Sequence, residues 1–260
     1  MKAILLSAGQ GRRLLPLTSE LPKCLLRVRG QATLLDEQLD ALARCGVREV
    51  ALMVGFGAGH VERAVAERRE DGLAIRTCFN PFYAQSDNLV TAWLARHEMD
   101  DAFVLLNGDT LFEPAALERL LARGRAPVAL AVAHKARYDD DDMKVVLDGE
   151  GCLRAIGKRL EGCRPDGEAI GMTLFRGAGA AAFRSALDAA VRRPDALRDW
   201  YTSVLGELAA KLPLHAVSIQ GLWWTEIDDA ADLDAARHAL ARAPEPRPSA
   251  PLAADPAFAR

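Results

Sequence analysis

The sequence has little of what marks several classes of protein. Aromatic residues make up 6% of its 260 positions, and 33 Lys and Arg stand against 36 Asp and Glu, which leaves a net charge of −3. Nonspecific binding to nucleic acid or to an anionic membrane depends on a strong excess of basic residues, which this chain lacks. We therefore expect no nucleic-acid or membrane partner, and any bound anion must be held by local geometry.

Cysteines and long apolar runs are scarce as well. The cysteines are odd in number and contain no Cys-x-x-Cys pair, which argues against a zinc site and against a disulfide framework. No stretch approaches the ~18 apolar residues of a membrane helix, and the N-terminal apolar run is too short for a signal peptide. We therefore expect a cytoplasmic protein. Free thiols are expected at Cys24, Cys45, Cys78, Cys152 and Cys163.

The first half of the chain alternates strand-like and helix-like segments. Strands are expected at 2–6, 49–54, 73–79 and 102–106, and helices at 34–45, 60–69 and 88–97. Strands that alternate with helices of roughly 10–15 residues imply right-handed βαβ units. The pattern predicts an α/β fold with a Rossmann-like, mostly parallel sheet flanked by helices.

The second half is richer in short strands and ends in prolines. Strands are expected at 128–134, 143–147, 153–158 and 169–175, and helices at 178–192, 199–211 and 229–242. We predict a single domain over 1–242, with halves at about 1–127 and 128–242, and an extended or disordered tail at 243–260. The apolar helices near 178–211 could furnish a homodimer surface.

A glycine turn, Gly9-Gln10-Gly11, follows the first strand and could aim backbone N–H groups at a phosphate. Leu14 stands where a dinucleotide-binding G-x-G-x-x-G turn needs its third glycine, and Val54 with Gly55 stands where that fold needs an acidic residue. A P-loop is excluded because the chain has no G-K-[ST] sequence.

Basic residues follow this turn: Arg12, Arg13, and then Lys23 after a proline. Such a set could grip a triphosphate from two sides, although a tight turn with a surface lysine is the plainer alternative. Residues 3–28 resemble the signature L-x-A-G-x-G-x-R-x-x-P-x-T-x-x-x-P-K-x-L of the nucleotidyltransferases that make nucleoside-diphosphate sugars and related activated headgroups. Ser7 and Cys24 are minor departures from that signature.

This resemblance extends over about residues 1–240 and implies a GT-A-like nucleotidyltransferase fold with a small acceptor-binding part. It assigns Lys23 to the charge on the transferred α-phosphate and Arg13 to the β- and γ-phosphates. The nucleotide-binding residues that it implies are Leu6, Ala8, Gly9, Gln10, Gly11, Arg12, Arg13, Lys23, Asn80, Tyr83, Ser86, Asp87, Asn88 and Gly108.

Two acidic positions match the metal ligands of that family. Asp109 follows Gly108 at the end of an expected strand, and Asp228 lies far downstream, with Glu226 as a helper. Joining two anions requires charge neutralisation, and hard carboxylate oxygens suit Mg²⁺. The alternative is that Asp228 or Asp229 only caps the last helix. The acidic run at 139–142 is interpreted as a solvated loop, because consecutive side chains point in different directions.

Residues 80–88 lack the base-reading pattern of sugar-phosphate uridylyl- and thymidylyltransferases and are similar to bacterial phosphocholine and phosphonate cytidylyltransferases. The resemblance implies a Mg²⁺-dependent cytidylyltransferase that joins CTP to phosphocholine, 2-aminoethylphosphonate or a similar acceptor. Its catalytic residues would be Lys23, Arg13, Asp109 and Asp228. The alternatives are a sugar-1-phosphate nucleotidyltransferase that uses UTP or dTTP, and a non-catalytic nucleotide-binding subunit.

The acceptor itself stays open at this point. A choline headgroup favours an aromatic cage, whereas a primary amine favours carboxylates such as Asp199. The candidates for a cage are Tyr138, Trp200, Tyr201, Trp223 and Trp224. Lys158 is expected to face the acceptor phosphate, with Lys144 in support. The acceptor-binding residues that the resemblance implies are Lys144, Lys158, Glu168, Gly171, Trp200, Tyr201, Trp224 and Glu226.

Overall fold

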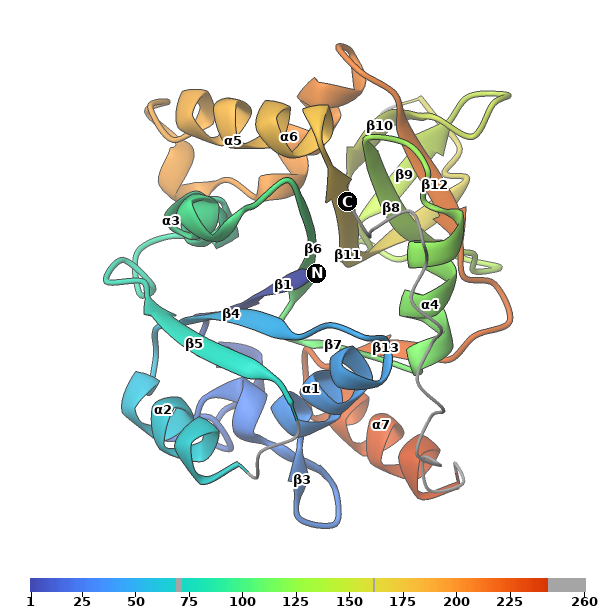
Figure 1. Cartoon of the computed structure of the whole chain (residues 1–260). Coiled ribbons are helices and arrows are strands. Elements are labelled where there is room, and N and C mark those ends of the chain that lie inside the picture. The colour runs from blue at the N-terminus through green and yellow to red at the C-terminus, as the bar shows by residue number, and fades with distance from the viewer. Residues whose placement is uncertain (69–71, 161, 243–260) are drawn as a thin grey trace.

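The computed structural model describes residues 1–68, 72–160 and 162–242, so the predicted tail lies outside the described residues. Its centre is a nine-stranded sheet (Figure 1). Seven strands form a continuous path, and β8 (Val128–Ala133) pairs with β11 and with β12 (Leu214–Ser218) beside it. The path runs β10 (Leu153–Gly157), β9 (Lys144–Leu147), β11 (Gly167–Arg176), β6 (Ala102–Asn107), β1 (Lys2–Ser7), β4 (Glu49–Val54) and β5 (Ala74–Phe79).

The first-half strands of the central sheet are parallel, as the sequence predicts. β1 lies between β4 and β6, and β5 pairs with the outer side of β4. Every residue of β1 is buried. Its side chains alternate between two cores, with Leu5 in one and Ile4 in the other. A parallel strand covered on both faces must be apolar throughout, which explains the uninterrupted run at 3–6.

The second half adds antiparallel strands to the same sheet. β11 pairs antiparallel with β6, β8 and β9, while β12 pairs parallel with β8. The sheet is therefore mixed, and the prediction of a Rossmann-like α/β sheet flanked by helices is confirmed. β12 is not among the strands that the sequence predicts.

Helices cover both faces of the sheet (Figure 1). α3, α5 and α6 pack on one face, and α1, α2 and α4 pack on the other. No helix of the described ranges is long and apolar enough to cross a membrane. The helices are α1 (Leu34–Arg44), α2 (Ala58–Glu67), α3 (Asn88–Leu94), α4 (Pro114–Arg123), α5 (Ala178–Ala190), α6 (Tyr201–Ala209) and α7 (Ala230–Arg242).

A two-stranded ribbon joins the end of the first half to the end of the second. β7 (Thr110–Phe112) pairs antiparallel with β13 (Trp224–Glu226), and α7 follows β13 directly. A second short pair, β2 (Arg27–Arg29) with β3 (Ala32–Thr33), packs against α7. The β7–β13 ribbon brings the segments around Asp109 and Asp228 together. Short 3₁₀ turns are η1 (Arg12–Leu14), η2 (Lys23–Leu25), η3 (Ala95–Glu98) and η4 (Ala196–Arg198).

Candidate functional site

The glycine turn after β1 is held against the segment that carries Lys23. Gly11 has a φ of 72°, which favours glycine, and a Cβ there would press on the Lys23 side chain. Thr18 Oγ1 donates a hydrogen bond to the Gly11 carbonyl at 2.8 Å. The spacing between the turn and the lysine thus has a structural reason, because the lysine stem crosses the turn.

The Lys23 ammonium lies between two carboxylates. Its Nζ is 3.0 Å from Asp109 Oδ2 and 2.9 Å from Asp228 Oδ1, and only 12% of the side chain is exposed. Burial alone would lower the pKa of Lys23, but Asp109 and Asp228 outweigh it and the pKa is raised. Burial would likewise raise the pKa of Asp228, yet Lys23 and Arg13 lower it. Lysine and aspartate are therefore both charged at neutral pH.

Backbone contacts fix the position of the two carboxylates. Gly108 lies so close to Ser7 and Leu6 of β1 that a Cβ would collide with both. The Ile227 N–H donates to the Asp109 carbonyl at 3.0 Å, which ties the β6–β7 turn to the residue before Asp228. Two segments more than a hundred residues apart therefore meet at one point.

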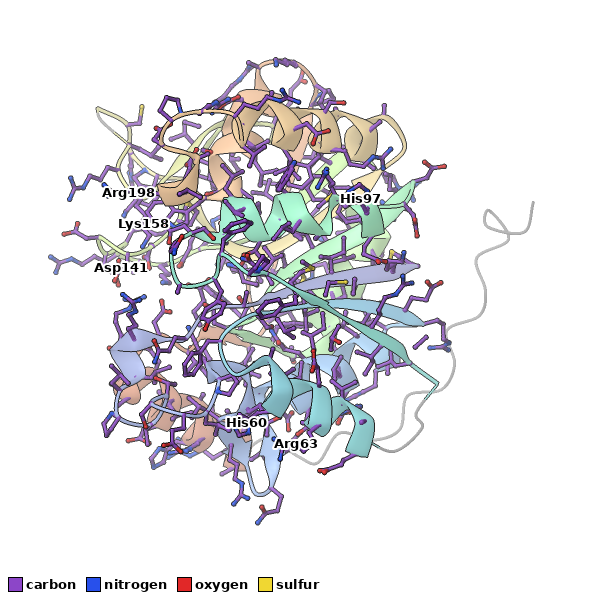
Figure 2. The ribbon with its side chains drawn as sticks, turned by 90° about the vertical axis from the view of Figure 1, so that its left-hand side faces the viewer. His60, Arg63, His97, Asp141, Lys158 and Arg198 are labelled. Carbon is purple, nitrogen blue, oxygen red and sulfur yellow. The ribbon has the colours of Figure 1, made fainter. Side chains whose placement is uncertain are left out.

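Arg13 extends this charge network towards the second half. Its guanidinium is 2.8 Å from Asp228 Oδ2 and 2.7 Å from Asp141 Oδ2, while Asp141 Oδ1 is 3.1 Å from Lys158 Nζ. Figure 2 shows Asp141 and Lys158 side by side at one edge of the molecule. Cations and carboxylates thus alternate from Lys158 to Asp109, and two cations expected to bind phosphate are already paired with Asp141.

Beside this network lies a hollow lined mostly by acidic residues, here called the acidic hollow. Its lining consists of Arg13, Lys135, Asp139, Asp140, Asp141, Asp142, Glu168, Trp224, Thr225, Glu226, Asp228, Asp229 and Asp232. Lys135 Nζ is 2.9 Å from Asp142 Oδ1 and 2.6 Å from Glu168 Oε2, and both carboxylates are almost fully buried. The hollow therefore carries a large excess of negative charge.

Two acids of this hollow hold protons more strongly than usual. Burial raises the pKa of Glu168 to about 7, although Lys135 opposes the shift. Burial, together with the charges of Asp109 and Asp228, raises the pKa of Glu226 well above its ordinary value. A cation that entered the hollow would favour the ionised forms of both acids.

The donor set around Lys23 suits a hard divalent cation. Asp109 Oδ1 is buried and has no hydrogen-bond partner among the described residues. Within those residues no group of three or more His, Cys, Asp or Glu could hold a metal ion by itself. Mg²⁺ is commonly bound by one or two carboxylates, with waters and substrate phosphates as its other ligands. Asp109 and Asp228 fit that pattern.

Most of the predicted nucleotide-binding residues line one cavity at the glycine turn, here called the glycine-loop cavity. Predicted residues in its lining are Leu6, Ala8, Gly9, Gly11, Lys23, Tyr83, Ser86, Asp87, Asn88, Gly108 and Asp109. Gln10 and Arg12 line an adjoining hollow that shares Tyr83, Ser86 and Asp87. Ser7, Cys24, Thr91 and Asn107 also line the glycine-loop cavity. These four are not among the predicted nucleotide-binding residues, although Ser7 and Cys24 lie within the nucleotidyltransferase signature at residues 3–28.

Asn80 does not reach the cavity surface. It is fully buried, its Nδ2 donates to Thr91 Oγ1 at 2.9 Å, and its Oδ1 accepts from the Phe82 N–H at 2.8 Å. The side chain thus holds the turn that carries Tyr83. Asn80 is expected from the sequence to contact a nucleotide, but its side chain has no exposed group with which to do so.

The predicted acceptor-binding residues are divided among several places. Trp200 lines the glycine-loop cavity and makes a cation–π contact with Lys158, whose Nζ is 4.9 Å from the ring centre. Lys144 donates to the Lys158 carbonyl at 2.8 Å, and both lysines line a further hollow with Tyr138. Gly171 packs against Asn107. Glu168, Trp224 and Glu226 lie in the acidic hollow.

The aromatic cage is not formed by the five candidate aromatics. Tyr201 is 1% exposed, packs edge-on against Phe183 in the core, and donates to Asn107 Oδ1 at 3.2 Å. Trp200, Tyr138 and Trp224 line three different hollows, and Trp223 packs against the core cluster around α7. Tyr201 therefore supports the site from the core rather than facing a ligand.

Two acidic segments have specific partners in the structure. The run at 139–142 is not simply a solvated loop, because Asp141 bridges Arg13 to Lys158 and Asp142 is buried against Lys135. Asp229 caps α7, since its Oδ1 accepts from the N–H groups of Ala231 and Asp232. Asp228 instead points to Lys23 and Arg13, so the capping alternative applies to Asp229 alone.

The fold and the site together are those of a nucleotidyltransferase. The chain belongs to the MobA-like NTP transferase domain family, whose model matches residues 3–245. Among curated proteins it is similar to the CMP-5'-(3-aminopropyl)phosphonate synthase of Streptomyces rubellomurinus, with 42% identity over 136 residues. It is also similar to the bifunctional IPC transferase and DIPP synthase of Aquifex aeolicus, with 26% identity over 242 residues.

These matches differ in their extent. The first covers 51% of this chain and 20% of the relative, and the second covers 92% of this chain and 52% of the relative, so the chain spans at most about half the length of either protein. Among solved structures, the inositol-1-phosphate CTP transferase from T. maritima superposes with a TM-score of 0.78 and 22% identity, over 93% of this chain and 95% of that one. That likeness establishes the fold.

Proposed function

We propose that the chain is a Mg²⁺-dependent cytidylyltransferase that joins CTP to a small phospho- or phosphono-monoester, giving a CMP-linked product and pyrophosphate. The observation that carries this proposal is the Lys23 ammonium between Asp109 and Asp228 at the glycine turn. The choice of CTP draws on the names of similar proteins, one a CMP-phosphonate synthase and one a CTP transferase.

The reaction needs no protein nucleophile. An anionic oxygen of the acceptor attacks the α-phosphorus of CTP and forms a new P–O bond, while the bond from the α-phosphorus to the bridging oxygen breaks and pyrophosphate leaves with the electron pair. No proton has to move because the attacking oxygen is already deprotonated. The backbone N–H groups of the glycine turn hold the triphosphate, and Lys23 stabilises charge on the transferred phosphoryl group.

The metal would be held by Asp109 and Asp228. Mg²⁺ supplies charge neutralisation between the triphosphate and the acceptor anion when it is bound. The Lys23 ammonium is paired with the same two carboxylates. Substrate binding would therefore draw the Lys23 ammonium from these carboxylates towards the α-phosphate.

The acidic hollow favours an acceptor that carries a positive charge at its far end. Glu168 and Asp142 are buried there with Lys135 as their cation, and Glu226 lies nearby. Complementary charge selects among ligands more than it adds affinity. The amine or quaternary ammonium group of an aminoalkylphosphonate or phosphocholine would gain from these carboxylates, whereas the uncharged sugar of a sugar phosphate would gain nothing.

A pyrophosphate-release panel tests the proposal. CTP, UTP, dTTP, GTP and ATP are each combined with phosphocholine, 2-aminoethylphosphonate and glucose-1-phosphate, with Mg²⁺ and then with excess chelator. We expect turnover only with CTP and a cationic acceptor, and only with Mg²⁺. Turnover with UTP or dTTP and glucose-1-phosphate would instead make the protein a sugar-phosphate nucleotidyltransferase. Tight CTP binding with no product from any acceptor would favour a non-catalytic subunit.

A further inference from the structure

Gln38, in the second turn of α1, lies directly beneath the turn that carries Asp109. Gln38 is 1% exposed. Its Nε2 donates two hydrogen bonds, one to the Asn107 carbonyl at 2.9 Å and one to the Thr110 carbonyl at 2.8 Å. Both amide hydrogens are thus used on one short stretch of backbone. Nothing in the sequence motifs marks this residue.

The two carbonyls flank Gly108 and Asp109, so Gln38 spans the turn. Gly108 is also held to β1 through its N–H on the Leu6 carbonyl at 3.0 Å. The Asp109 carbonyl accepts from Ile227. The direction of the Asp109 carboxylate depends on this backbone and on Lys23 alone, because its Oδ1 has no hydrogen-bond partner in the described part of the chain.

The helix that carries Gln38 is itself well fixed. Thr33 and Asp36 form a capping box at the N-terminus of α1, and Leu35, Leu39 and Leu42 are buried in the core beneath the sheet. The amide orientation follows from its neighbours, because two carbonyls can only accept and therefore require the NH₂ group. A rigid helix thus presents two donors at a fixed place.

We infer that Gln38 is a positioning residue that fixes the Asp109 carboxylate for metal binding by clamping the backbone on both sides of it. The inference rests on the proposed function, since it requires Asp109 to bind a divalent cation. Removal of residues that orient metal ligands typically costs roughly 10–100-fold in metal affinity or activity. Gln38 should therefore affect metal binding well beyond its effect on stability.

The test compares Gln38→Met, which keeps the length of the side chain but has no donor, with Leu42→Val on the same helix. Leu42 is fully buried in the core and its apolar side chain makes no hydrogen bond to the Asp109 turn, so its variant reports on lost packing. Mn²⁺ binding is followed by electron paramagnetic resonance with a non-hydrolysable CTP analogue present. The melting temperature, the Mg²⁺ concentration for half-maximal rate, kcat and the KM for CTP are measured alongside.

We expect Gln38→Met to weaken Mn²⁺ binding and raise the half-saturating Mg²⁺ concentration by roughly 10–100-fold, with the KM for CTP at saturating Mg²⁺ changed by less than about threefold. Leu42→Val should lower the melting temperature and leave metal binding unchanged. Equal metal binding in Gln38→Met and wild type would overturn the inference.

A further variant guards against misfolding. If Gln38→Met does not fold, Gln38→Glu keeps the shape of the side chain and replaces the NH₂ group, which donates twice, with a carboxyl oxygen that can donate at most once. It should therefore weaken Mn²⁺ binding in the same direction. Unchanged metal binding in Gln38→Glu would also overturn the inference. Failure of the wild type to bind Mn²⁺ at all would remove the metal site, and with it the proposed function, whereas normal wild-type binding isolates the role of Gln38.

Discussion

Lys23 Nζ lies 2.9 Å from Asp228 Oδ1, although the two residues are 205 positions apart in the chain. The lysine is bound at the same time to Asp109, so one ammonium holds the end of β6 and the end of β13 together. With 12% of its side chain exposed, this lysine is better shielded from solvent than a surface ion pair. The proposed function requires substrates to rearrange this contact.

Replacement of Lys23 should separate metal binding from catalysis. In Lys23→Met the ammonium no longer competes for Asp109 and Asp228, so Mn²⁺ should bind more tightly in the absence of nucleotide. Turnover should nevertheless fall by about 10²–10³-fold, because the donor that stabilises charge on the transferred phosphate is lost. Calorimetric titration with Mn²⁺ and steady-state pyrophosphate release measure the two effects. Weaker Mn²⁺ binding in Lys23→Met would contradict this account.

Asp228 and Asp229 provide a matched pair of neighbouring acids. Asp228→Asn should abolish Mg²⁺-dependent turnover, because Asp228 is a proposed metal ligand whose carboxylate lies between Lys23 and Arg13. Asp229→Ala should leave turnover within about twofold and lower the free energy of unfolding by about 1 kcal/mol, since Asp229 caps α7 and, although it lines the acidic hollow, is not paired with Lys23 or Arg13 in the described part of the chain. Urea unfolding and pyrophosphate release distinguish the two variants. Loss of turnover in Asp229→Ala alone would reverse the assignment.

The residues that the sequence predicts well are those in which local pattern and site coincide. The apolar run of β1, the glycine turn and Lys23 follow one another within about 20 positions, and each is constrained by its neighbours through the Gly11 and Thr18 contacts. Asp109 is marked by its place after a strand and a glycine. The expected strands and helices of the first half all lie close to their predicted positions.

The remainder depends on contacts that have no local signal. Residues 139–142 are all aspartates, yet Asp142 is buried while Asp141 bridges two distant cations. The position of the loop between β8 and β9 relative to Arg13 and Lys158 determines which carboxylate forms the bridge between these two cations. Gln38 is ordinary for a helix, and its role follows from the packing of α1 beneath the β6–β7 turn.

Asp141 should compete with the acceptor phosphate for Lys158. It forms one ion pair with Lys158, which is expected to bind the acceptor phosphate, and a second with Arg13, which is expected to bind the triphosphate. Such pairs contribute about 0.2–1 kcal/mol, so Asp141→Asn should lower the KM for the acceptor by up to about fivefold. Asp140→Asn is the control, because Asp140 makes no ion pair within the described residues. A higher acceptor KM in Asp141→Asn than in Asp140→Asn would mean that Asp141 helps to bind the acceptor.

Stability should fall with rising pH over the range in which Glu168 ionises. Its pKa is raised to about 7, chiefly by burial, so the folded state favours the protonated acid. That contribution is complete below the ordinary pKa of about 4.5 and is lost as the pH rises through about 7. The free energy of unfolding should therefore decrease between about pH 5 and pH 7.5, by at most about 3 kcal/mol. The raised pKa of Glu226 acts in the same direction.

Glu168→Gln should flatten this dependence, because a neutral amide occupies the same buried place at every pH. Asp228 and Asp142 have lowered pKa values, so their contributions to stability are lost as the pH falls below about 4 and lie outside the measured window. Urea unfolding of both proteins at pH 5.5 and pH 7.5, without divalent cations, gives the comparison. An equal loss of stability in Glu168→Gln would assign the pH dependence to Glu226 or another group, since Glu168 can no longer titrate.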